Sequence, residues 1–180
     1  MAKVIIDPGH GGWDNGAQYQ GRREKDDNLN IALAVGNILT LYGFQVYYTR
    51  TEDVYESPYQ KAVEGNARGG ELFLSIHRNA SPFPNQYNGV ESLIYSGGGF
   101  SQLVAENING QLERIGFRNA GIEERKNLVV LNSTVMPAVL VEVGFINSDV
   151  DNLLLDSIFT ETAYAIADGV AMSFFPENYS

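Results

Sequence analysis

Two hydrophobic patterns alternate along the chain. Short apolar runs rich in β-branched and aromatic residues predict buried strands, and they lie at 4–7, 44–49, 72–77, 90–95, 127–131 and 138–145. Between them, apolar side chains recur every three or four positions, which predicts amphipathic helices. These helical segments lie at 25–42, 58–69, 100–116 and 159–174, and the first three end at or just before a glycine.

The alternation of strands with helices predicts the fold class. Strands separated by helices of this length favour an α/β sandwich, in which helices cover both faces of the sheet. A chain of 180 residues is large enough to bury roughly 70% of its unfolded surface in one core. No repeat and no linker interrupts the pattern, so we expect a single domain over residues 1–180 with a short tail at 176–180.

Composition excludes several classes of function. A net charge of −10 argues against binding to nucleic acid or to an anionic membrane surface, because both need clustered lysine and arginine. The absence of cysteine excludes disulfides, thiolate zinc sites and thiol nucleophiles. The first apolar run, Val4–Ile6, is too short for a signal-peptide core, and nothing approaches the roughly 18 apolar residues of a membrane span.

The chain has two histidines, and both follow predicted strands. His10 lies in "VIIDPGHGG" and His77 ends "LFLSIH". A single histidine at such a place is usually a hydrogen-bonded packing residue, but the ends of parallel strands share one edge of a sheet. Two imidazoles there predict a metal site with a carboxylate as third ligand. Spacing does not choose among the candidate carboxylates, which are Asp7, Asp14, Glu24, Asp26 and Asp27.

Glu142 is the one charged residue in the apolar segment "PAVLVEVGFIN". A buried, unpaired carboxylate costs several kcal/mol, so such a group is usually paired, neutralised or functional. Alternation places it on the same side as Ala138 and Leu140, at the end of its strand. It could simply reach solvent there. Beside a metal, it would accept a proton from water and pass it to a leaving group.

Five segments occur in this order along the chain: "VIIDPGHGGWDNGA", "EKDDNLNIALAV", "LYGFQVYYTR", "LFLSIHRNA" and "MPAVLVEVGFIN". Together they closely resemble the type 3 family of zinc-dependent N-acetylmuramoyl-L-alanine amidases, which includes bacterial autolysins, sporulation amidases and phage endolysins. The resemblance covers residues 3–174, roughly, and the five segments are highly specific in combination, whereas any one alone is weak.

The resemblance implies that His10, Glu24 and His77 bind one Zn²⁺ per chain and that Glu142 is the catalytic carboxylate. It also implies a mostly parallel, six-stranded sheet. The implied reaction is hydrolysis of the amide bond between the lactyl group of N-acetylmuramic acid and L-alanine in peptidoglycan. Water activated at the metal would attack, with Glu142 as general base and then general acid.

The resemblance also implies where the protein acts and what it contacts. We expect a monomer that acts on the bacterial cell wall, outside the cytoplasm, after secretion or release by lysis. No export signal is visible in this chain, and its negative charge makes it a poor anchor on anionic wall polymers. We therefore expect any wall targeting to come from a separate module or partner.

Three positions depart from the family's usual residues. Arg78 replaces an alanine, Lys61 replaces an arginine before "NARGG", and Asn147-Ser148 stand in reversed order. None coincides with an implied ligand, although Arg78 could alter the preference for the peptide stem if it pointed into the cleft.

Two other functions fit part of the pattern. Two histidines and a carboxylate also form the facial triad of non-haem iron oxygenases, but the α/β pattern and Glu142 argue against that class. A binding module on an inactive scaffold would be expected to lack one of the four implied residues.

Because histidine binds zinc only when neutral, zinc affinity should fall below roughly pH 6.5.

Overall fold

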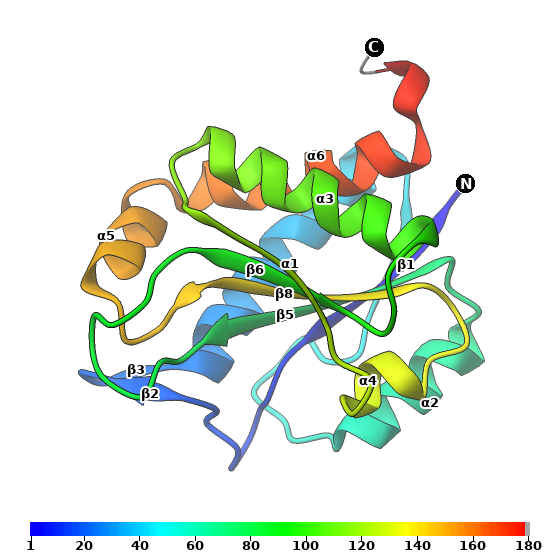
Figure 1. The fold of residues 1–180 in the computed structure, drawn as a ribbon. Coiled ribbons are helices and arrows are strands. Elements are labelled where there is room, and N and C mark those ends of the chain that lie inside the picture. The colour runs from blue at the N-terminus through cyan, green and yellow to red at the C-terminus, as the bar shows by residue number, and fades with distance from the viewer. Residues whose placement is uncertain (179–180) are drawn as a thin grey trace.

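The computed structural model describes residues 1–178, and its centre is a six-stranded sheet in the order β4-β1-β5-β8-β6-β7 (Figure 1). The strands are β1 (Lys3–Pro8), β4 (Gln45–Tyr48), β5 (Leu72–Asn79), β6 (Val90–Ile94), β7 (Asn119–Glu124) and β8 (Ala138–Phe145). Strands β4, β1, β5 and β8 run parallel, β6 is antiparallel to β8, and β7 is parallel to β6. The predicted α/β fold with a mostly parallel sheet is confirmed.

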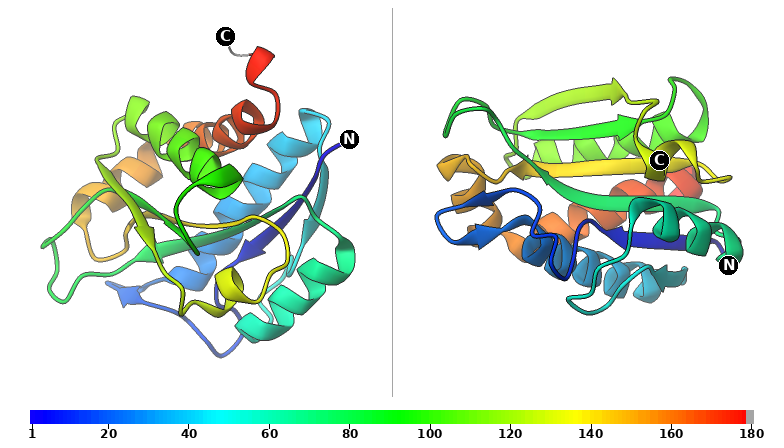
Figure 2. Two further views of the ribbon diagram at one scale, coloured as in Figure 1. Left: turned by 45° about the vertical axis from the view of Figure 1, so that its right-hand side comes forward. Right: turned by 90° about the horizontal axis from the view of Figure 1, so that it is seen from below.

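Helices cover both faces of the sheet, as predicted. Figures 1 and 2 show α3 and α6 on one side and the shorter α2 and α4 on the other. Contacts of α1 with α6, β1 and β5 assign it to the α3–α6 side. The helices are α1 (Glu24–Leu41), α2 (Pro58–Arg68), α3 (Gly99–Arg114), α4 (Val129–Asn132), α5 (Asp149–Ser157) and α6 (Phe159–Phe174). A two-stranded hairpin, β2 (Gln18–Tyr19) and β3 (Arg22–Arg23), lies before α1.

Strand alternation produces two cores of unequal size. Val4 and Ile6 belong to the larger core beneath α1, α3 and α6, whereas Ile5 between them belongs to the smaller core. The smaller core also holds Phe73 and Leu140 and packs against α4. Because α2 and α4 are short, this second layer gives less cover to the sheet, and the site described below lies on this face.

The sixth strand differs from the prediction. Residues 127–131 do not form a strand, because Val130 and Leu131 enter the smaller core from the short helix α4 instead. The actual sixth strand is β7, whose sequence NAGIEE contains no buried residue. Its polar residues have low strand propensity, and pairing with β6 holds it at the sheet edge. Helix α5 was also not predicted; Ser148 caps it by accepting a hydrogen bond from the Asp151 amide at 3.2 Å.

The predicted tail lies only partly within the described residues. Pro176–Asn178 forms one 3₁₀ turn, and residues 179 and 180 are outside the described part.

Arg78 does not point into a cleft, because its side chain is fully buried on the opposite face of β5 from His77. It forms an ion pair with Asp27 of α1 and donates to the Phe145 carbonyl at 3.2 Å and to Asn152 Oδ1 at 2.7 Å. Arg78 therefore joins β5, α1, the end of β8 and α5. An effect on peptide-stem preference by direct contact is excluded by this geometry.

The other two unusual positions also have structural roles. Lys61 of α2 forms a 2.8 Å ion pair with Asp7, and both side chains are buried. Its ammonium group also donates to the Pro8 carbonyl at 2.6 Å, so it ties α2 to the end of β1. Asn147 Nδ2 donates to the Ser81 carbonyl at 2.7 Å and Asn147 Oδ1 accepts from the Ser81 amide at 3.0 Å.

We expect the substitution Arg78→Ala to lower the free energy of unfolding by about 3 kcal/mol, since it breaks a buried ion pair and leaves carbonyls unsatisfied. Urea denaturation followed by circular dichroism measures the change. The matched control is Lys126→Ala, which removes an exposed cation 3.8 Å from Glu124 and should change stability by less than about 0.5 kcal/mol. Equal stability of the two variants would contradict the role assigned to Arg78.

Candidate metal centre

His10 is held by a tight turn immediately after β1. Its backbone has a φ of 59°, in the left-handed region, which costs a non-glycine residue about 1–3 kcal/mol. Residues Gly11 and Asp14 close the turn with two backbone hydrogen bonds, both 3.0 Å long. Asp14 Oδ2 lies 2.8 Å from His10 Nδ1. When Nδ1 donates this hydrogen bond, Nε2 keeps its lone pair for another partner.

Glu24 is the first residue of α1, and the loop before the helix fixes its carboxylate. The Glu24 amide donates to the Ala17 carbonyl at 2.9 Å, and Glu24 Oε2 accepts from the Ala17 amide at 2.8 Å. An acidic group here is also favoured by the helix dipole. The other carboxylate oxygen, Oε1, accepts from Asn28 Nδ2 at 3.3 Å and is directed toward the two histidines.

His77 lies on β5 and completes a cluster with His10 and Glu24. Glu24 Oε1 is 3.1 Å from His10 Nε2 and 2.9 Å from His77 Nδ1. One ligand atom from each residue lies within 4.8 Å of the others, and the imidazole rings meet edge to face at 5.1 Å. The structure thus brings together two imidazoles and one carboxylate from segments far apart in the sequence.

The other carboxylates considered from the sequence take different roles. Asp14 bonds the far nitrogen of His10, and Asp7 pairs with Lys61. Asp26 forms an ion pair with Arg23 at 2.7 Å, and Asp27 forms one with Arg22 at 2.7 Å.

The cluster fits a metal ion with nitrogen and oxygen ligands. Bonds of about 2.0–2.2 Å in a tetrahedral zinc site put neighbouring ligand atoms about 3.3–3.6 Å apart, slightly more than the 2.9 and 3.1 Å separations of the cluster. Two histidines and one carboxylate are a common donor set of catalytic zinc sites, which keep one position open.

Two glycines give the cluster its space. A Cβ on Gly9 would lie 2.2 Å from the His77 ring, and one on Gly16 would lie 2.5 Å from Glu24 Oε2.

The charge of the cluster favours a cation. Burial raises the pKa of Glu24, but hydrogen bonds and charges from the two histidines hold it far below its usual range. Burial lowers the pKa of His10, but Glu24 and Asp14 outweigh this effect and raise the pKa to about 9. The carboxylate therefore stays ionised, and without a metal ion a proton on His10 provides the compensating positive charge at pH 7.

Glu142 lies beside the cluster on β8, paired in register with His77 of β5. It shares the sheet face of Ala138 and Leu140, as the alternation predicts. Its Oε2 atom is buried and has no hydrogen-bond partner within the described part of the chain. Burial raises the pKa of Glu142 to about 7, with Glu24 and Glu91 adding to the effect and His77 opposing it. A carboxylate with this pKa can take up or release a proton near neutral pH.

Glu91 was missed in the sequence, although it carries the same signal as Glu142. It is the single charge in the apolar strand β6, and it stands opposite Glu142 in the antiparallel ladder. Asn79 Nδ2 donates to its carboxylate at 3.2 Å. Burial and the charge of Glu123 raise the pKa of Glu91.

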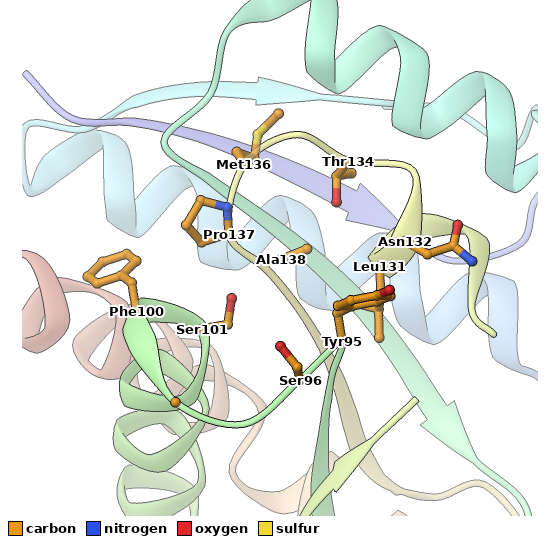
Figure 3. Close-up of a pocket in the computed structure, with 11 residues that line it drawn as sticks. Tyr95, Ser96, Phe100, Ser101, Leu131, Asn132, Thr134, Met136, Pro137 and Ala138 are labelled. Carbon is orange, nitrogen blue, oxygen red and sulfur yellow. The ribbon is translucent and has the colours of Figure 1, made fainter. Parts of the chain in front are cut away.

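A cavity of about 240 Å³ opens onto the cluster. Its polar side includes His10, His77 and Glu56, and its apolar side is formed by residues of the segment 128–130 and by Leu140. A second cavity of about 390 Å³ lies at the start of β8 (Figure 3). Its lining contains no histidine and no carboxylate. Of these two cavities, the smaller one joins a binding space to acid–base groups.

Comparison with protein families identifies a match over almost the whole chain. The sequence signature of the N-acetylmuramoyl-L-alanine amidase family matches residues 4–172. The amidase CwlM of Bacillus licheniformis is 36% identical over 97% of this chain and 69% of its own length. The endolysin of Bacillus phage SPP1 is 37% identical over 95% of this chain and 66% of its own length. The chain thus spans about two thirds of these relatives.

Solved structures give the same result for the fold. An N-acetylmuramoyl-L-alanine amidase from Clostridium difficile 630 superposes with a TM-score of 0.89 at 31% identity, covering 99% of this chain and 98% of that one. The catalytic domain of the amidase CwlV from Bacillus (Paenibacillus) polymyxa var. colistinus gives 0.88 at 31% identity, covering 98% and 99%. Within the described residues, no helix combines the length and apolar character needed to cross a membrane.

Proposed function

The chain belongs to the N-acetylmuramoyl-L-alanine amidase family, and from this premise we propose that it hydrolyses the amide bond between the lactyl group of N-acetylmuramic acid and L-alanine in bacterial peptidoglycan. We propose that the reaction depends on one Zn²⁺ held by His10, Glu24 and His77. We assign the role of general base and acid to Glu142. The substrate would be the cell wall, outside the cytoplasm.

One observation carries this proposal: Glu142, whose buried Oε2 has no hydrogen-bond partner among residues 1–178, stands next to a cluster that fits a metal ion. Glu142 is paired in register with His77, and the ligand atoms of His10, Glu24 and His77 lie within 4.8 Å. The adjoining cavity of about 240 Å³ would admit the reacting part of a chain-like substrate.

A bound zinc ion would supply a Lewis acid that polarises a carbonyl and lowers the pKa of water. Glu142 accepts the proton of the attacking water and returns it to the nitrogen of the departing alanine. Burial raises the pKa of Glu142 to about 7, close to neutral pH, so the carboxylate can both accept and release a proton. Asp14 orients the imidazole of His10 through Nδ1, and Asn28 helps to orient the carboxylate of Glu24.

Digestion of purified peptidoglycan tests the proposed function. The protein is incubated with the wall polymer with and without a chelator, and the new chemical ends are identified by mass spectrometry. We expect free alanine amino termini and intact muramic acid, with no products under chelation and full recovery after addition of zinc. New reducing sugars or cleaved peptide bonds would contradict the assigned bond, and cleavage that persists in chelator would contradict zinc dependence.

We expect zinc affinity to fall about tenfold for each pH unit below about 9, because zinc must displace one proton from His10. This onset is more alkaline than the ordinary histidine pKa of about 6.5, since Glu24 and Asp14 raise the pKa of His10 to about 9. A raised pKa means that His10 holds its proton more tightly, so the proton competes more strongly with zinc and affinity falls as the pH is lowered. Competition titrations with a chromophoric chelator between pH 6 and 9.5 measure this slope, and a flat profile would contradict ligation by His10.

We also propose that residues 1–180 act as one catalytic domain and that wall targeting, where it is needed, comes from another module or partner. The net charge of −10 supports this division, since anionic wall polymers repel a negative surface. Co-sedimentation with intact walls tests the proposal, and we expect most of the protein to stay in the supernatant. Tight pelleting of this chain alone would contradict it.

A further inference from the structure

Two stacked aromatic side chains stand exposed beside the proposed metal centre. Trp13 is the only tryptophan of the chain and is 76% exposed. Tyr55 is 38% exposed, and the two ring centroids are 4.3 Å apart at an interplanar angle of 36°. Tryptophan is on average a highly buried residue, and an exposed pair of rings in contact is a common feature of binding surfaces.

Hydrogen bonds hold the backbone on both sides of the pair. Trp13 lies in the turn closed by the two hydrogen bonds between Gly11 and Asp14. The Gly12 amide donates to Asp53 Oδ1 at 2.8 Å, and the nearly buried Lys25 bridges the Gly12 carbonyl at 2.6 Å and Asp53 Oδ2 at 2.8 Å. The turn that carries Trp13 is thereby fastened to the segment that leads to Tyr55.

The two segments also touch at the level of the main chain. A Cβ on Gly11 would lie 2.1 Å from the Val54 carbonyl oxygen, and one on Gly12 would lie 2.7 Å from the Tyr55 amide nitrogen. Only glycine permits this approach. Because the backbones are fixed, binding a ligand to the two rings costs little conformational entropy.

The pair lies at the rim of the proposed site. Trp13 precedes Asp14 and Tyr55 precedes Glu56, and both of these acidic residues line the cavity that contains His10 and His77. Asp14 is in direct contact with His10. A ligand lying on the rings would therefore lie beside the residues that line the cavity containing the two histidines.

We propose that Trp13 and Tyr55 form a sugar-binding platform that stacks against an N-acetylated hexose of the glycan strand. This inference rests on the proposed function, in which the scissile bond links a sugar's lactyl group to a peptide, so a sugar ring must lie close to the metal centre. A pyranose presents a flat face of C–H groups that fits an aromatic ring, while its hydroxyl groups stay in water.

The charges around the platform favour sugar over peptide. Asp14 and Glu56 follow the two rings in the chain, and Asp53 accepts from the Gly12 amide. The Lys25 that pairs with Asp53 is nearly buried, whereas Asp53 stays half exposed, so a stem peptide that carries its own carboxylates would be repelled there. An N-acetylated hexose without an ionised group is not subject to this repulsion. The charge pattern therefore assigns the platform to the glycan side of the bond.

Intrinsic fluorescence tests this directly, because Trp13 is the only tryptophan. The full chain is titrated with an uncharged oligosaccharide of N-acetylglucosamine, with and without zinc, and separately with free stem peptide. We expect a saturable blue shift with the oligosaccharide in both metal states and none with the peptide. A shift with peptide alone would make the platform a peptide site, and no shift with either ligand would also overturn the proposal.

Kinetics with matched variants provide the second readout. Trp13→Ala should raise KM on polymeric peptidoglycan about tenfold, as for a typical aromatic contact residue, with kcat and zinc content nearly unchanged. Trp13→Phe should restore most of the affinity. The control Tyr164→Ala removes a 43% exposed aromatic from α6 and should leave KM unchanged. A fall in kcat together with loss of zinc would mean that Trp13 only supports the His10 turn, which would overturn the platform.

The two proposals can fail separately. The fluorescence titration requires no turnover, so glycan binding without amide cleavage would refute the proposed reaction and leave the platform intact. Cleavage of the muramoyl–alanine amide without a fluorescence response to the glycan would refute the platform and leave the proposed reaction intact.

Discussion

The Glu142→Gln variant is expected to hydrolyse peptidoglycan about 10²–10⁴ times more slowly than the parent, the range typical of a lost general base. Glutamine has nearly the same shape but cannot accept a proton from water at neutral pH. The variant should retain zinc, because Glu142 is not one of the three residues whose ligand atoms lie within 4.8 Å of one another. It should also fold, since the substitution removes a buried ionisable group whose Oε2 has no hydrogen-bond partner in the described residues.

Three measurements are needed to interpret this variant: the rate of release of alanine amino termini, the zinc content per chain, and the midpoint of thermal unfolding. The control is Glu123→Gln, which makes the same chemical change at a half-exposed position on β7 and should keep the parent rate. A Glu142→Gln protein with near-full activity would remove Glu142 from the mechanism. A variant that has lost zinc as well as activity would point to a structural role.

Substitution His77→Ala is expected to empty the metal site. Zinc sites with four protein ligands bind the ion with about 10–16 kcal/mol, so one ligand carries about 2.5–4 kcal/mol. Zinc affinity should therefore fall by about two to three orders of magnitude, and hydrolysis should fall with it. His10→Ala should behave in the same way, whereas Asp14→Asn, which only disturbs the orientation of His10, should weaken binding about 10–100-fold.

Zinc analysis after dialysis against chelators of graded affinity measures this loss. The control is Asp26→Asn, which alters a carboxylate in the same helical turn as Glu24. Because Asp26 is 41% exposed and pairs with Arg23, its substitution should leave zinc content unchanged. If Asp26→Asn lost zinc while His77→Ala retained it, the proposed ligand set would be wrong.

The sequence predicts most of the sheet because the strong signals come from strands buried on both faces. Segments such as 72–77 and 138–145 are continuous apolar runs, as expected for the central strands of a parallel sheet. The apolar run at 127–131 gives a similar signal, but residues 129–131 lie in the one-turn helix α4 and residue 128 is its N-cap. In so short a run, periodicity cannot distinguish a buried strand from a buried helix. Strand β7 has no such signal, because its partner β6 rather than its own side chains stabilises it.

The candidate site could be predicted in part. Strand-end placement brings His10 and His77 to one edge, and isolation in an apolar strand singles out Glu142. Spacing alone leaves the third ligand open among five carboxylates, because that choice depends on how the loop before α1 folds. In the structure this choice depends on reciprocal hydrogen bonds between Glu24 and Ala17, which connect positions with no recognisable sequence pattern.

Some partners of the site are visible only in three dimensions. Arg78 follows His77 directly, yet the pleat sends its side chain into the opposite layer, to Asp27. Trp13 and Tyr55 are 42 residues apart in the numbering, and glycine-mediated contact between their loops brings the rings together. Neither contact leaves a periodic signal in the chain.

Strand β8 is the last strand in the chain but lies near the middle of the sheet, between β5 and β6 (Figure 2). During synthesis, β5 and β6 are therefore made before β8, the strand that pairs with both. These pairings join distant parts of the chain, and such long-range contacts form slowly. A partly synthesised chain that lacks β8 also lacks Glu142. Such a chain would lack the proposed general base and would have an open sheet, so a wall-degrading activity would arise late, when synthesis and folding of this region are nearly complete.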